Sequence, residues 1–147
     1  MKNLLVSLSF AILFLVAIGC KKSADVDPRD QYVGSYNVTA SVSVKVSLNP
    51  IGSTVDRYNI IVEKGSAPNE LKFTDPSNTY VVELDGNKYI VPVFTTTKTL
   101  NGTNYSVRTI GSGVFNENSM TVSFSANNYT NSITTQWDWI GSGVKYK

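Results

Sequence analysis

The sequence contains no histidine and only one cysteine, Cys20. Without histidine, the Ser-His-Asp and Cys-His nucleophile systems are excluded, together with the side chain that most often acts as general base or metal ligand. A single cysteine excludes a disulfide within the chain, and it excludes metal sites built from several thiolates. Only carboxylates, lysines and tyrosines remain as candidates for catalysis, and no pattern among them predicts catalytic residues.

The chain also lacks any excess or block of one charge. It has 13 Lys and Arg and 11 Asp and Glu, which gives a formal net charge of +2 over 147 residues. Nucleic-acid-binding domains present a basic patch or stripe, so this balance predicts no nucleic-acid partner. Helical periodicity is absent beyond residue 20, whereas the strand formers Thr, Tyr and Val and the turn formers Asn, Gly and Ser are frequent. This composition is typical of an all-β protein.

The one long apolar run lies at the N-terminus. Lys2 gives a positive start, residues 4–18 are mostly apolar, and Ala17-Ile18-Gly19 lead into Cys20. This is the order of a secretory signal peptide, and the run is shorter than the roughly 20 residues that cross a bilayer. Ala17 to Cys20 also resemble the lipobox of bacterial lipoproteins. The resemblance implies cleavage before Cys20, a diacylglycerol on its sulfur and anchoring in a membrane.

In the lipoproteins that the chain resembles, a lysine such as Lys21 after the cysteine is no signal for inner-membrane retention. We therefore expect anchoring in the outer membrane, with the periplasmic and the surface side as open alternatives. The expected division is a signal peptide over 1–19, a lipidated cysteine and flexible tether over 20–30, and one domain over 31–147.

Three aspartates in the expected tether lack the glycine and bidentate glutamate of a Ca²⁺ loop. They are Asp25, Asp27 and Asp30. We read this stretch as solvated chain, and the sequence predicts no metal site and no cofactor.

Strict alternation over residues 36–48 is the clearest structural signal. The even positions are apolar, and the odd positions between them are polar. This period of two predicts a strand with one dry and one wet face. We expect the strand to end at Asn49–Ser53 and the next to span 55–63.

Turn signals recur along the rest of the chain. Asp85-Gly86 and Asn101-Gly102 each separate two strand-like runs and predict hairpins. Pro92 lies inside such a run and predicts an edge strand or a bulge. Ile110–Val114 and Ile140–Val144 repeat the motif IGSGV, which we interpret as bends or bulges in two strands. Together these signals predict eight or nine strands in an antiparallel meander, forming a barrel or, alternatively, a β-sandwich.

Trp137-Asp138-Trp139 is the most conspicuous aromatic cluster. In a strand, the two tryptophans share one face and Asp138 points the opposite way. They form either an aromatic platform for a ligand or part of a small β core. The same alternatives hold for the other candidate ligand-binding residues, Tyr36, Tyr80 and Phe124.

Gly34-Ser35-Tyr36 at the start of this meander resembles the lipocalin-like domains of small lipoproteins of the Bacteroidetes type. The resemblance implies an antiparallel barrel of about eight strands with an internal cavity. We therefore expect a non-enzymatic, lipid-anchored envelope protein that binds a small apolar ligand or a glycan. The alternative is a structural or protein-interaction module with a filled core that docks on another envelope protein, and a carboxylate-based hydrolase is the least supported reading.

Overall fold

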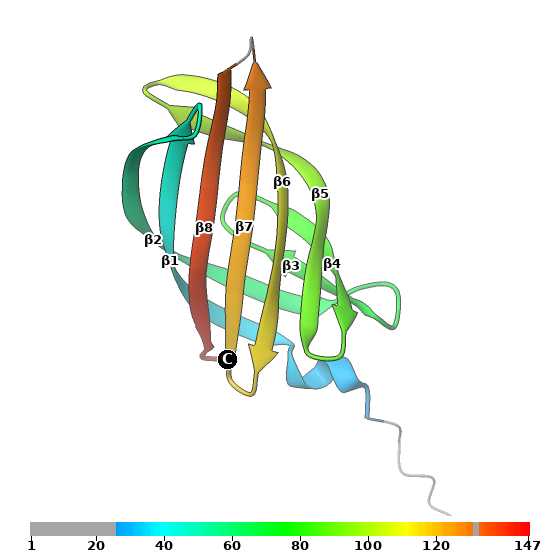
Figure 1. The fold of residues 1–147 in the computed structure, drawn as a ribbon. Helices are drawn as coiled ribbons and strands as arrows, with labels where there is room; N and C mark the ends of the chain where they lie inside the picture. Colours follow the sequence, from blue (N-terminus) through cyan, green and yellow to red (C-terminus); the bar gives the residue numbers. More distant parts are fainter. Residues whose placement is uncertain (1–25, 131–132) are drawn as a thin grey trace, which may run out of the picture.

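The computed structural model describes residues 26–130 and 133–147, which form a closed eight-stranded barrel (Figure 1). Each strand pairs antiparallel with the next, and the last pairs with the first. The predicted meander is confirmed, and the barrel rather than the sandwich is observed. In the described ranges no helix is long and apolar enough to span a membrane. The strands are β1 (Gly34–Val46), β2 (Asn49–Lys64), β3 (Glu70–Thr74), β4 (Thr79–Asp85), β5 (Lys88–Leu100), β6 (Thr103–Asn116), β7 (Ser119–Thr130) and β8 (Ile133–Lys145).

The alternating residues of β1 explain its central place in the barrel. Tyr36, Val38, Ala40 and Val42 are buried, and the polar residues between them lie on the outer face. Along most of its length β1 pairs with β2 on one side and with β8 on the other. β1 therefore has one buried face, as the alternation predicts, and is hydrogen-bonded to a neighbouring strand on each side.

The first hairpin turns earlier than expected. Its turn is at Ser47 and Leu48, which have φ values of 48° and 71°, and Asn49–Ser53 belongs to β2. Pro50 is accommodated there because it lies at a register shift, opposite Lys45, and because the far edge of this part of β2 has no ladder partner in the described chain.

The prediction of an edge strand or a bulge at Pro92 is confirmed on both counts. The β5–β6 register shifts between Val91 and Phe94, so Pro92 lies in a bulge. Pairing of β5 with β4 covers only Lys88–Ile90, so the rest of β5 is an edge.

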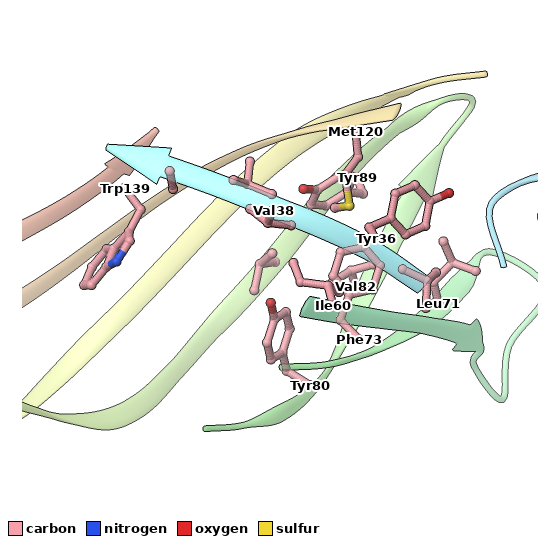
Figure 2. Close-up of a cluster of buried hydrophobic side chains, with 14 of the residues drawn as sticks. Tyr36, Val38, Ile60, Leu71, Phe73, Tyr80, Val82, Tyr89, Met120 and Trp139 are labelled. Atoms are coloured by element: carbon pink, nitrogen blue, oxygen red, sulfur yellow. The ribbon is translucent and has the colours of Figure 1, made fainter. Parts of the chain in front are cut away.

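One end of the barrel is closed by aromatic packing. Tyr36, Phe73, Tyr89 and Phe115 are at most 1 % exposed, and their rings contact one another at centroid distances of 5.0–6.1 Å. Figure 2 shows Tyr36, Phe73 and Tyr89 within one cluster, with Trp139 at its far end. The turns β2–β3, β4–β5 and β6–β7 lie at this closed end, and the turns β1–β2 and β5–β6 lie at the opposite, open end.

A short 3-10 helix, η1 (Pro28–Gln31), seals the closed end. The guanidinium of Arg29 donates to the carbonyl oxygens of Gly65, Ala67 and Glu70 at 2.6–3.2 Å. Asp27 caps the helix, and its hydrogen bonds with Arg29 hold the pKa of Asp27 well below its usual range. The expected tether over 20–30 is therefore too long at its C-terminal end, because residues 27–30 are packed onto the barrel.

The barrel wall is uneven because β3 and β4 are short (Figure 1). β2 pairs with β3 only over Ile61–Lys64, and β4 pairs with β5 only over Glu83–Asp85. Towards the open end, residues 49–60 of β2 and 91–100 of β5 each keep a ladder partner on one side alone within the described chain. The wall is therefore incomplete between β2 and β5.

The two glycine repeats allow close packing, and the first also borders a bulge. Gly111 and Gly113 in β6 lie against the rings of Phe124 and Tyr89. Gly111 lies opposite Val91 at the β5–β6 register shift, whereas the second repeat coincides with none. A methyl group at Gly141 in β8 would overlap the backbone of Thr39 and Ala40. The repeats allow side chains and neighbouring strands to approach more closely than any larger residue permits.

We expect Gly141→Ala to lower the free energy of unfolding by about 1–3 kcal/mol, since the clash is with backbone atoms that cannot rotate away. The matched control is Gly52→Ala in β2, where a methyl group has nothing within 4 Å, and the change should stay within about 0.5 kcal/mol. Urea unfolding of both variants measures the difference. Equal stabilities would contradict a packing role for the repeat.

Candidate functional site

A cavity of about 320 Å³ occupies the barrel towards its open end. It is partly open to solvent, and it lies where the wall is incomplete, since β2, the β3–β4 turn and β5 all contribute to its lining. Its aromatic lining residues are Tyr58, Tyr80, Phe94, Phe124 and Trp139. A cavity of this size lies at the small end of the range for small-molecule sites, about 300–1,000 Å³, and its aromatic lining is typical of them.

The aromatic wall is built on Tyr80 of β4. Its ring stacks on Phe94 with centroids 5.2 Å apart and planes inclined by 11°, and it meets Phe124 edge-on at 6.2 Å. Phe94 and Phe124 are half-buried, so each presents part of its ring to the cavity. Ring contacts of this kind hold the apolar surface of the cavity in place.

The cavity lining also includes a charged side chain, that of Lys98 on β5. Its ammonium nitrogen lies 4.5 Å from the ring centroid of Trp139, and the indole nitrogen of Trp139 donates to Oδ2 of Asp56 at 3.3 Å. Burial lowers the pKa of Lys98, while Asp75 and Asp56 act in the opposite direction through space. Lys98 forms no ion pair or hydrogen bond with any residue that the structure describes.

Two hydroxyl groups in the cavity lining have no hydrogen-bond partner among the described residues. They are Oη of Tyr80 and Oγ1 of Thr109, on side chains that are 8 % and 4 % exposed. Burial raises the pKa of Tyr80 far above its usual value, so its hydroxyl remains a donor. A buried polar group without a partner costs about 1–3 kcal/mol, and a ligand atom in the cavity would supply the missing partner.

The candidate ligand-binding residues divide into two groups. Tyr80, Phe124 and Trp139 line the cavity together. Tyr36 lies in the closed end, where its hydroxyl donates to the carbonyl oxygen of Tyr32 at 2.8 Å. Trp137 is also buried, with its ring 6.0 Å from that of Tyr105, and is not among the lining residues.

The geometry predicted for the tryptophan pair is confirmed. Trp137 and Trp139 both point into the barrel, and Asp138 lies on the outer face, where it pairs with Lys45 at 3.2 Å. Trp139 lines the cavity, so the platform reading stays a prediction for it, whereas Trp137 packs in the core.

Sequence reasoning missed Lys98, Phe94 and Thr109. The bulge at Pro92 changes which residues of β5 point inward, from odd positions such as Val91 to even positions such as Phe94. A single alternation drawn through the strand therefore places Lys98 on the wrong face. The signal was present, since Pro92 predicted a bulge and Phe94 and Lys98 share the parity that follows it.

Acidic side chains do not assemble into a metal site in the described ranges. No group of three or more Asp, Glu, His or Cys residues comes close enough to hold an ion there. Asp56 and Asp75 line the cavity, but each already accepts hydrogen bonds, Asp56 from Trp139 and Asp75 from the backbone of Ser77 and Asn78. Asp25 and Cys20 lie outside the described residues.

We expect Tyr80→Phe to leave the free energy of unfolding of the ligand-free protein unchanged or to raise it by about 1 kcal/mol, because it removes a buried hydroxyl without a partner. Tyr89→Phe is the matched control. The hydroxyl of Tyr89 donates to the carbonyl oxygen of Thr121 at 2.6 Å, so its loss should cost about 1 kcal/mol. Urea unfolding after refolding from denaturant, which removes bound molecules, compares them. Equal losses would show that Tyr80 is as well satisfied as Tyr89.

Comparison with known proteins found no family model, no curated protein and no solved structure that matches this chain. The function is therefore argued from the cavity and from the N-terminal sequence.

Proposed function

We propose that this chain is a non-enzymatic, lipid-anchored protein of the bacterial outer membrane that binds a small, largely apolar ligand in its barrel. The observation that carries the binding proposal is the cavity, in which five aromatic residues surround two buried hydroxyl groups that have no protein partner among the described residues. A folded core usually fills such space and pairs such groups. Ligand-binding pockets combine an apolar lining with a few polar groups that orient the ligand.

The packing of the closed end supports binding over a purely structural module. Large aromatic side chains fill that half of the barrel completely, so the chain has residues suited to filling an eight-stranded barrel. Towards the open end Trp137 is buried, but a cavity remains beside it. The filled-core alternative does not account for this cavity.

The proposed anchor places the cavity in a definite orientation. Cys20 precedes Val26, the first described residue, by only six positions, which corresponds to a reach of at most about 20 Å. Val26 leads directly into η1 at the closed end (Figure 1). A lipid on Cys20 would thus hold the closed end near the membrane and the cavity away from it.

Native mass spectrometry of residues 21–147, purified from a bacterial periplasm, tests ligand binding. This stretch retains η1 and all eight strands. We expect an added mass that is lost on denaturation and whose value distinguishes an apolar molecule from a glycan. Repeated preparations with the bare polypeptide mass, and no shift on adding lipid extract, would contradict the proposal.

A matched pair of variants locates that mass in the cavity. Thr109→Phe places a ring in the cavity and should abolish the added mass, whereas Thr95→Phe, on the exposed face of β5, should retain it. Circular dichroism confirms that both variants fold. Retention of the mass by a folded Thr109→Phe variant would place the ligand elsewhere.

The anchor has its own test. In a bacterial host, the full chain should start at Cys20 after processing, carry the mass of a diacylglyceryl group and at least one further acyl chain, and partition with outer membranes. Cys20→Ser should remove the lipid mass and release the protein from membranes, because a thioether to glycerol needs the sulfur. An unmodified wild-type protein in the soluble fraction would contradict the lipid anchor.

A further inference from the structure

We propose that the ligand carries an oxyanion, such as a carboxylate, that pairs with Lys98. This inference rests on the proposed function, because it concerns the chemistry of the ligand in the same cavity. It follows from the polar groups of the cavity lining, because some of them have hydrogen-bond partners in the protein and others have none among the described residues.

One oxygen of each carboxylate in the cavity lining already has a donor. Oδ2 of Asp56 accepts from the indole nitrogen of Trp139, and Oδ1 of Asp75 accepts from the backbone of Ser77 and Asn78 at 2.7 and 2.8 Å. These bonds fix the indole and the β3–β4 turn. Both carboxylates thereby help to hold the cavity wall through one oxygen each.

The donors in the cavity are free. Lys98, Tyr80 and Thr109 have no hydrogen-bond acceptor among the described residues, and the contact of Lys98 with the Trp139 ring satisfies its charge only in part. The exposed Arg57 also borders the cavity, whose lining holds two basic residues and the two aspartates. A partly buried ammonium group without an acceptor is unfavourable, and a bound anion relieves that cost. A ligand that brings an acceptor would supply the missing partner of these groups, and a negatively charged acceptor matches Lys98.

The position of Lys98 also defines how the ligand lies. Lys98 and Phe94 share the inner face of β5, four residues apart, and the cross-strand neighbour of Phe94 is Thr109. Along a strand this separation is about 13 Å between Cα atoms. A small amphipathic molecule would thus place its oxyanion at Lys98 and its apolar body against Phe94 and Tyr80. A second acceptor on the natural ligand would meet the two hydroxyls.

Decanoate and decanol test the headgroup alone, since they share an apolar chain and differ in charge. We expect refolded residues 21–147 to bind decanoate at least about ten times more tightly than decanol in isothermal titration at neutral pH. Lys98→Met should reduce this preference to within about twofold and leave decanol binding unchanged. Lys88→Met, at an exposed position at the start of β5, should retain the full preference.

Equal binding of the two probes, loss of both in Lys98→Met, or binding of neither overturns the headgroup assignment. The mass experiment separates this failure from failure of the proposed function. If the co-purified molecule is neutral and is lost when Thr109→Phe fills the cavity, the proposed binding function stands and only the oxyanion is overturned.

Discussion

The short β3–β4 hairpin is the constraint on which the rest of this barrel depends. β3 and β4 have five and seven residues, whereas the other strands have 12 to 16. Short strands close the wall at one end and cannot reach the other. As a result β2 and β5 continue upward without a common neighbour, and the interior between them is open to solvent where a complete barrel would be sealed. Both the packed half and the cavity follow from this difference in length.

Side-chain size also differs between the packed half and the cavity. At the closed end, the inward positions of β3 and β5 carry Phe73 and Tyr89. Tyr32, the residue after η1, stacks its ring on Phe115 at a centroid distance of 4.5 Å. Further along, the inward position of β6 is occupied by Thr109, which is too small to meet the rings across from it. Gly111, next to it on the inner face, accommodates the ring of Phe124. Small residues on β6 thus make room for aromatic rings that line the cavity and stop short of filling it.

Local patterns predicted the fold well because each element agrees with its own sequence. The alternation in β1 and the turns at Asp85-Gly86 and Asn101-Gly102 are sufficient for an antiparallel meander, and Gly86 and Gly102 have the positive φ values that such turns require. The site was predicted less completely. A bulge in β5 exchanges which positions point inward and which point outward, and its exact place depends on the pairing of β5 with β6. Tyr36 and Tyr80 show the same limit. Both are inward tyrosines, and only the lengths of neighbouring strands determine which faces a cavity.

The strongest support for a ligand is the difference between buried tyrosines whose hydroxyl groups have a hydrogen-bond partner and the one in the cavity that has none among the described residues. Tyr36 and Tyr89 are buried as deeply as Tyr80, and each donates to a backbone carbonyl, so the fold can pair a buried hydroxyl where packing alone is required. Among the described residues, Tyr80 has no such partner at the cavity, and Lys98 has no acceptor in the same cavity. Phenylalanine and an apolar straight chain at these two positions would give a more stable empty barrel. Polar groups that lower the stability of the unliganded fold and share one cavity are best explained by a molecule that binds them.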